Sequence, residues 1–165
     1  MEYKYQPKTK EELKRLCVDD SIYLGDIDTS LITDMSRLFY NGFFEESYRK
    51  DFSGIEKWDV SNVTDMSSMF SGASDFNEPI GNWNTSKVEN MACMFCRAEK
   101  FNQPIRDWDV SNVKDMRGMF CYAKNFNQPI GDWTVDNVED MSGMFEGQSL
   151  LGSLHEQYVQ RRQKL

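Results

Sequence analysis

The sequence predicts an α/β repeat solenoid, and three observations lead to this fold class. Phenylalanines close the same phrase repeatedly, and the last four, Phe70, Phe95, Phe120 and Phe145, are 25 residues apart. Within each phrase, the apolar residues of W-x-V are two apart, which is the spacing of a strand. The apolar residues of V-x-x-M-x-x-M-F are three and then four apart, which is the spacing of a helical or 3₁₀ turn. A repeat of this length cannot bury its apolar side alone, so we expect stacked coils around one continuous core.

The composition of the chain follows from this repeat. The chain has 165 residues and a mean hydropathy of −0.66, yet it contains ten Met and eleven Phe. All four Trp share one repeat position, and nine of the ten Met occupy two other positions. Large apolar side chains are therefore confined to fixed positions that face the core.

Each coil is predicted to carry a short strand on one face and a helical turn on the other. I-x-x-W-x-V gives a strand whose Trp and Val point inward, as for Trp108 and Val110, and these strands stack in parallel. In V-x-x-M-x-x-M-F, a carboxylate such as that of Asp65 caps the start of the turn. F-N-x-P-I then returns the chain to the next strand, because Pro fixes φ and lacks a donor.

Terminal helices are predicted to cover the ends of the stack. Thr9-Lys10-Glu11-Glu12 has the capping-box pattern, which predicts a helix over about 9–19. Ser153-Leu154-His155-Glu156 repeats this signature and predicts a helix over about 153–163. The length fits one domain, which we expect to comprise an N-terminal cap region (1–23), five repeats with an insertion at about 40–52 (24–147) and a C-terminal cap helix (148–165).

Charge and hydropathy argue against several classes of protein. The net charge of −8 and the pI of about 4.7 disfavour a nucleic-acid binder, which needs a basic face. No apolar run approaches the roughly 18 residues that a membrane-spanning helix needs. The N-terminus has no apolar signal core, which favours a cytoplasmic location.

The phrases W-D-V-S-N-V-x-D-M-x-x-M-F and F-N-Q-P-I resemble the BspA-like leucine-rich-repeat family, in a branch catalogued as a domain of unknown function in mycoplasma lipoproteins. The resemblance covers residues 24–147 and implies right-handed, leucine-rich-repeat-like coils. Members are often bacterial surface proteins, and some resemble adhesins that bind host proteins. The resemblance therefore implies a cell-surface or secreted location as the alternative, and it carries over no catalytic residues.

The repeated Met, Trp and Asn positions are predicted to be structural. Met recurs beside Phe and Val, which favours the core over a soft-metal site or a binding groove. Trp stands where the leucine-rich spacing L-x-x-L-x-L has an inward leucine, which favours burial of the Trp over stacking on bases or sugars. A buried indole N–H then needs an acceptor, which a carbonyl of the neighbouring coil can supply. Asn77, Asn102 and Asn127 are predicted to satisfy backbone groups as a ladder rather than to contact a ligand.

Neither a metal nor another cofactor is expected. Cys93 and Cys96 form C-x-x-C, but a second C-x-x-C is missing and the one histidine, His155, is remote. Cys96 and Cys121 are 25 residues apart and are expected to be neighbours, either as a disulfide or as the free thiols that suit a chain without a signal. The Asp-rich phrases lack the known calcium loops, and one histidine does not support a nucleophile–His–acid site.

The outward positions beside Trp and Val are the best candidates for a binding site. Seven of these fifteen positions are Asp and one is Lys, so stacking would produce an acidic sheet face. This face is either a solubilising surface or a docking surface for a basic protein, to which the aromatic insertion adds. The candidate partner-binding residues are Asp26, Asp28, Asp59, Asp107, Asp109, Asp132, Asp136, Phe43 and Phe44.

These features lead to a non-enzymatic protein-interaction module as the first hypothesis. An adhesin-like protein that binds host extracellular proteins is the second, and it rests on the family resemblance alone. An enzyme or metal protein of another type and a purely structural role in an assembly are the further alternatives.

Overall fold

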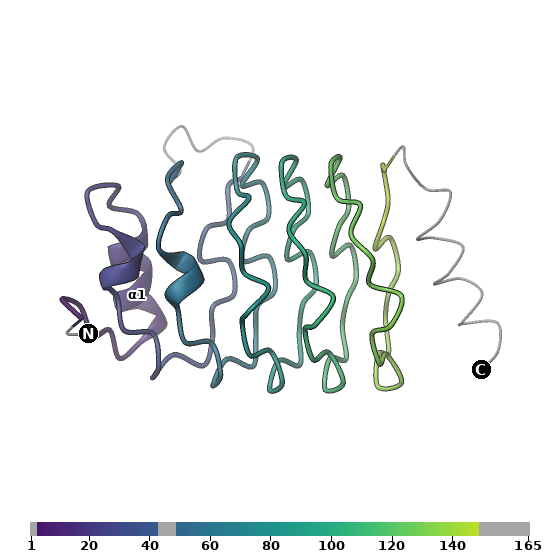
Figure 1. Ribbon diagram of the computed structural model, residues 1–165, viewed down its shortest axis with the longest axis horizontal. Helices are drawn as coiled ribbons and strands as arrows, with labels where there is room; N and C mark the ends of the chain where they lie inside the picture. The colour runs from purple at the N-terminus through teal and green to yellow at the C-terminus, as the bar shows by residue number, and fades with distance from the viewer. Residues whose placement is uncertain (1–2, 43–48, 149–165) are drawn as a thin grey trace.

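The computed structural model describes residues 3–42 and 49–148. Successive repeats lie side by side along the long axis of the molecule, each as one coil of the chain (Figure 1). We number the repeats 1 to 5; repeats 2 to 5 begin at Ile55, Ile80, Ile105 and Ile130. The predicted C-terminal helix and residues 43–48 of the insertion lie outside the described residues.

Regular structure in the described residues is confined to three short elements, α1 (Lys10–Cys17), η1 (Leu24–Asp26) and η2 (Ile55–Lys57). The helix predicted over 9–19 is confirmed as α1, whose N-cap Thr9 accepts a hydrogen bond from the Glu12 backbone N–H at 3.2 Å. Leu13 and Cys17 face inward and are buried, so α1 covers the first coil at the N-terminal end of the stack (Figure 1).

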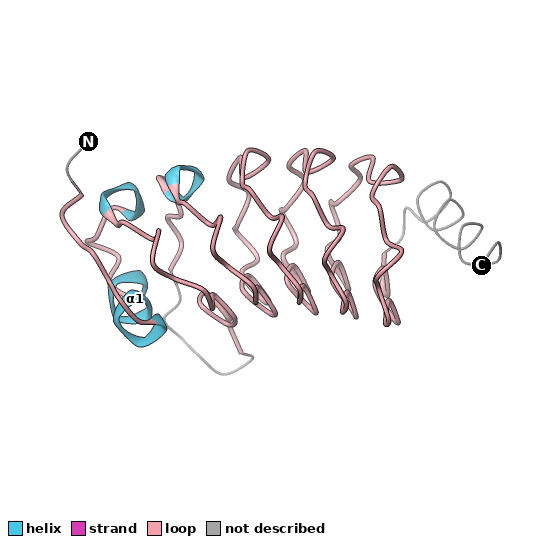
Figure 2. Ribbon diagram, turned by 90° about the horizontal axis from the view of Figure 1, so that it is seen from below, coloured by secondary structure: helices cyan, strands magenta, loops and turns pink. Residues whose placement is uncertain are grey.

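Parallel pairing between coils consists of single-residue bridges, and no strand or sheet forms in the described residues. The bridges join Asp34 to Asp65, Asp65 to Asn90, Asn90 to Asp115, and Asp115 to Asp140. Outside the three helical elements the described chain is loop and turn (Figure 2). The predicted α/β repeat solenoid, with leucine-rich-repeat-like strands on one face and helical turns on the other, is therefore wrong.

The W-x-V segments do not form strands because local turns use backbone groups at their two ends. The Trp83 N–H donates to the Ile80 carbonyl at 3.2 Å, and the Val63 N–H donates to the Val60 carbonyl at 2.9 Å. Neighbouring coils are joined here by side chains instead; the Thr85 hydroxyl, for example, donates to the Asp109 carbonyl at 2.9 Å. We call this part of the coils the tryptophan side, which comprises residues 26–31, 57–62, 82–87, 107–112 and 132–137.

The M-x-x-M-F segments carry the backbone pairing that was expected of W-x-V. In repeat 2, every second residue donates its N–H to repeat 3, at 2.8–2.9 Å, from Met66, Ser68, Phe70 and Gly72. A continuous helix is impossible here because Ser68 has φ 55° and Gly72 has φ 78°. We call this part the ladder side, which comprises residues 34–42, 65–73, 90–98, 115–123 and 140–148.

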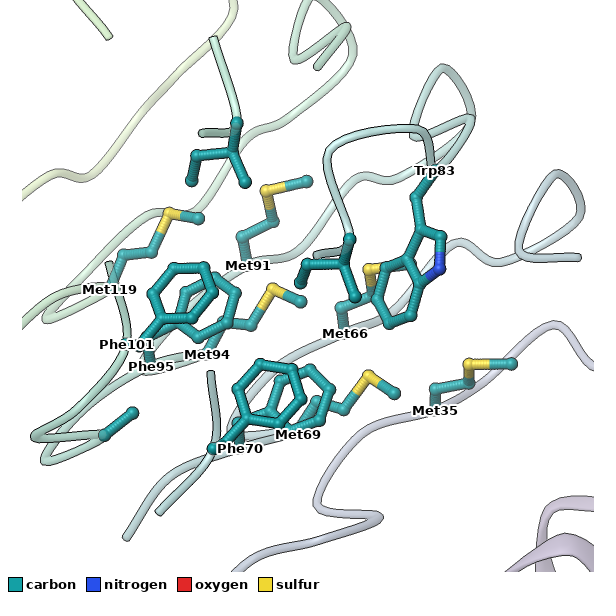
Figure 3. Packing of buried hydrophobic residues seen from close by; sticks show 14 of the residues in the cluster. Met35, Met66, Met69, Phe70, Trp83, Met91, Met94, Phe95, Phe101 and Met119 are labelled. Atoms are coloured by element: carbon teal, nitrogen blue, oxygen red, sulfur yellow. The ribbon is translucent and has the colours of Figure 1, made fainter. Parts of the chain in front are cut away.

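The core lies between the two sides and is built from the repeated apolar positions. Phe70 and Phe95 of successive repeats stack with their ring centroids 5.6 Å apart, and Phe70 stacks on Phe76 of its own repeat at 3.8 Å. The methionines follow one another from repeat to repeat beside these rings (Figure 3). Met66 and Met91 are fully buried, which confirms the prediction that the methionines belong to the core.

A buried arginine joins α1 to the insertion. The guanidinium of Arg49 donates to the carbonyls of Cys17, Asp19, Ile22 and Asp51. Its side chain is buried although no carboxylate lies in direct ion-pair contact with it among the described residues. Carbonyl oxygens from the end of α1, from the residues that follow it and from Asp51 therefore supply the acceptors that this buried charge requires.

Candidate binding face

The seven candidate aspartates all lie on the tryptophan side, and we call this set the acidic face. Asp26 and Asp28 of repeat 1 are partly exposed. The other five, Asp59, Asp107, Asp109, Asp132 and Asp136, are exposed. The face is not the sheet that was predicted, because its segments are loops. Phe43 and Phe44, the aromatic candidates, lie outside the described residues.

Three of the carboxylates also shape the backbone. Oδ1 of Asp59 accepts the Ser61 N–H at 2.9 Å, and Oδ1 of Asp28 accepts the Ser30 N–H at 3.0 Å. Oδ1 of Asp109 accepts both the N–H of Ser111, at 3.0 Å, and its hydroxyl, at 2.6 Å. These contacts are Asx turns. This role was not predicted, although the spacing Asp-x-Ser is the signal in the sequence that could have shown it.

Asparagine performs the same task in repeat 3. The Asn84 amide oxygen accepts the Ser86 N–H at 3.2 Å and the Ser86 hydroxyl at 2.7 Å. The turn therefore needs an oxygen acceptor at this position but no charge. The negative charge in repeats 1, 2 and 4 is an addition that the fold of the turn does not require.

Hydrogen bonding keeps two of these carboxylates ionised. The hydroxyl and the N–H of Ser61 hold the pKa of Asp59 below its usual range, and Ser111 does the same for the pKa of Asp109. Both contacts favour the charged form because they donate to it. Since Oδ1 carries the turn in each case, Oδ2 is left to accept from a partner.

The acidic face contains two ion pairs of its own. Lys4 pairs with Asp26 at 2.5 Å, and Arg106 of repeat 4 pairs with Asp132 of repeat 5. The remaining five carboxylates make no ion pair within residues 3–42 and 49–148; they are those of Asp28, Asp59, Asp107, Asp109 and Asp136.

Elsewhere on the molecule, three acids pair with a lysine of the next repeat. Lys100 pairs with Asp75 at 2.5 Å, and Lys124 pairs with Glu99 at 2.6 Å. Next to the ladder side, Lys114 pairs with Glu89 at 2.6 Å. In each pair the two residues are 25 apart, so they occupy matching places in adjacent repeats. These paired acids contrast with the five carboxylates of the acidic face, which make no ion pair among the described residues.

The tryptophans and asparagines form the structural ladders that were predicted. The Trp58 indole N–H donates to the Leu24 carbonyl at 2.8 Å, and that of Trp108 donates to the Ile80 carbonyl at 3.0 Å. Both indoles are buried. Oδ1 of Asn77 accepts the Asn102 N–H at 2.9 Å. These side chains are committed to neighbouring repeats, so they position the acidic face without belonging to it.

The four cysteines are free thiols, and Cys17 is buried in the core. Cys93, Cys96 and Cys121 lie on the ladder side, where Cys96 and Cys121 are neighbours, as their spacing predicts. Residues 3–42 and 49–148 contain no group of three or more His, Cys, Asp or Glu that could hold a metal ion. His155 lies outside these ranges.

Comparison with known proteins places the repeats in a family. The model of the family described as "Mycoplasma protein of unknown function, DUF285" matches residues 33–157. No curated protein and no solved structure matches the chain. A search of the described residues finds no helix with the length and apolar character needed to cross a membrane.

Proposed function

We propose a function for this chain, which belongs to the DUF285 family of mycoplasma proteins of unknown function. It is a non-enzymatic protein-interaction module. Its docking surface is the acidic face, and its partner is a protein with a basic segment. One observation carries this proposal. Five carboxylates gather on one side of the coils without an ion pair among the described residues, whereas Asp75, Glu89 and Glu99 elsewhere each pair with a lysine of the next repeat.

The geometry of the acidic face suits a basic partner. Asx turns hold Asp28, Asp59 and Asp109 in place before any partner arrives, so little side-chain freedom is lost on binding. Each keeps one carboxylate oxygen for a Lys or Arg of the partner. Charge complementarity of this kind raises association rates and excludes acidic partners.

A pair of triple variants tests the face against a matched control. The test variant carries Asp28→Asn, Asp59→Asn and Asp109→Asn. The control variant carries Asp65→Asn, Asp115→Asn and Asp140→Asn on the ladder side, where the same Asx turns occur, as in the Ser67 N–H to Asp65 contact at 2.8 Å. Asn84 and Asn90 already perform these turns in repeat 3, so both variants keep the fold while losing equal charge.

Pulldown from the native source, with mass spectrometry, identifies the partner with the wild-type chain. We then expect the control variant to recover that partner at the wild-type level and the test variant to lose it. Titration of the purified partner should show the same difference in Kd, with a strong dependence on salt. Equal recovery and equal Kd for the two variants would show that the acidic face is only a solubilising surface.

A second candidate is a surface adhesin-like protein that binds host extracellular proteins. It is favoured by the likeness of the repeat phrases to BspA-like proteins, and it requires a surface location rather than a cytosolic one. Fractionation of native cells decides between these two locations. Detection of the protein only in the cytosol removes the adhesin, and surface labelling of intact cells supports it.

A further inference from the structure

The ladder side brings three of the four cysteines into one patch. Cys93 and Cys96 belong to repeat 3, and Cys121 of repeat 4 occupies the position that matches Cys96. All three side chains are partly exposed, whereas Cys17 is buried. The patch lies on the other side of the coils from the acidic face, so the proposed function does not involve it.

Backbone hydrogen bonds hold Cys96 and Cys121 in register. The Phe95 N–H donates to the Met119 carbonyl at 2.9 Å, and the Arg97 N–H donates to the Cys121 carbonyl at 2.7 Å, so the pair is fixed from both sides. Parallel neighbours lie about 4.8 Å apart, which is within the Cα separation of about 4.4–6.8 Å that a disulfide needs. The two thiols are close enough for Cys96 to be among the groups that raise the pKa of Cys121.

We propose that Cys96 and Cys121 are a disulfide-forming site that links repeats 3 and 4, with a low-molecular-weight disulfide such as glutathione disulfide as the oxidant. The Cys96 thiolate attacks one sulfur of the oxidant, which breaks its S–S bond and releases one glutathione thiolate. Cys121 then attacks Cys96 Sγ in the mixed disulfide and releases the second glutathione thiolate. Two electrons pass to the oxidant, and the two cysteine protons end on the two glutathione thiols.

The surroundings of the thiols set the order of these two attacks. Burial, together with the neighbouring Cys96, raises the pKa of Cys121 to about 12. Cys121 therefore stays in its unreactive thiol form, and we assign the first attack to Cys96. Cys121 reacts only when it faces the mixed disulfide directly.

Cys93 is kept out of the reaction by its packing. Gly118 occupies the matching position in repeat 4, with φ +56°, and a Cβ added there would lie 3.2 Å from Cys93 Sγ. The Cys93 thiol thus fills the space that this glycine leaves open. Burial also raises the pKa of Cys93, which lowers its reactivity.

The experiment uses the full reduced chain in glutathione buffers of increasing disulfide fraction. We expect the thiol count in denaturant to fall from four to two, because Cys17 and Cys93 remain free. Trypsin should then yield fragments 88–97 and 118–124 joined to each other until a reductant is added. The oxidised chain should melt at a temperature several degrees higher, because the link closes a loop between two repeats.

Serine variants assign the pair. Cys93→Ser should form the linked fragments as the wild type does, whereas Cys96→Ser and Cys121→Ser should not form them. Circular dichroism of each reduced variant confirms that it is folded. The proposal is overturned by a disulfide confined to fragment 88–97, by a persistent glutathione adduct, by linkage that survives Cys96→Ser, or by a thiol count that stays at four.

Discussion

The ladder side and the tryptophan side hold the same coils together by different means. On the ladder side, backbone N–H groups donate to the next repeat whatever the side chain is, as from Cys93 to Arg117 at 2.7 Å. On the tryptophan side, the contacts between coils come from particular side chains, such as the Trp108 indole and the Asn112 amide. Substitutions should therefore act strongly on the tryptophan side, whereas on the ladder side they should act through backbone conformation.

The largest effect is expected from Trp108→Ala. The side chain is 3% exposed and stacks on Trp83 at 6.3 Å, so its removal leaves a cavity and deprives the Ile80 carbonyl of its donor. We expect a loss of about 3–5 kcal/mol in the free energy of unfolding. Urea unfolding followed by circular dichroism measures it.

The control for this prediction is a side-chain change on the ladder side. Ala92→Ser introduces the residue that repeats 2 and 5 already carry at this position, Ser67 and Ser142. The Ser68 N–H donates to the Ala92 carbonyl, a contact that the substitution leaves intact. We expect a change within about 0.5 kcal/mol. Equal losses for the two variants would contradict the distinction between the sides.

A smaller effect of opposite sign is expected from Ser68→Gly on the ladder side. Ser68 has φ 55°, a conformation that glycine adopts without strain, and Gly118 and Gly143 occupy the same repeat position. We expect the free energy of unfolding to rise by about 0.5–1 kcal/mol, because relief of strain exceeds the entropy that glycine adds to the unfolded chain.

The reverse substitution, Gly118→Ala, checks this reasoning. It places a Cβ 3.2 Å from Cys93 Sγ at a positive φ, so we expect a loss of about 1–2 kcal/mol. A gain in stability from Gly118→Ala, or a loss from Ser68→Gly, would show that backbone strain does not govern the ladder side.

The sequence predicted the buried side chains and their contacts on the tryptophan side, but not the backbone pairing on the ladder side. The period predicted the core positions of Met, Phe and Trp, and the need of a buried indole for an acceptor predicted the carbonyl contacts of Trp58 and Trp108. The capping box predicted α1. In the candidate site, the spacing beside Trp placed the aspartates together on one side of the coils.

The location of the backbone pairing could not be predicted from the same patterns. A step of three residues between Met66 and Met69 suits a helix, but here it arises from turns that alternate with residues of positive φ. The recurrence of Gly at ladder positions, as at 72, 118, 143 and 147, is the signal that distinguishes these cases. The alternation of apolar residues in W-x-V shows which side chains are buried. It does not show to which acceptors the backbone N–H groups of the segment donate.

The smallest effect concerns the dependence of stability on pH. The folded chain holds the pKa of Asp59 and Asp109 below the value of about 3.9 that an unfolded Asp has. Their contribution to stability is therefore complete above about pH 4 and is lost as the pH falls through the folded pKa values. Urea unfolding between neutral pH and pH 2 should show stability decreasing in the acid range.

Two variants change this acid sensitivity in opposite directions. In Asp59→Asn with Asp109→Asn, the amide oxygens keep the Asx turns without titrating, so the decrease below pH 4 should become shallower. Asn84→Asp places a carboxylate in the matching turn of repeat 3, where Ser86 donates to it as Ser61 does to Asp59, and it should make the decrease steeper. If both variants instead follow the wild-type curve, the Asx turns contribute nothing to acid stability, and the aspartates of the acidic face are retained for their charge alone.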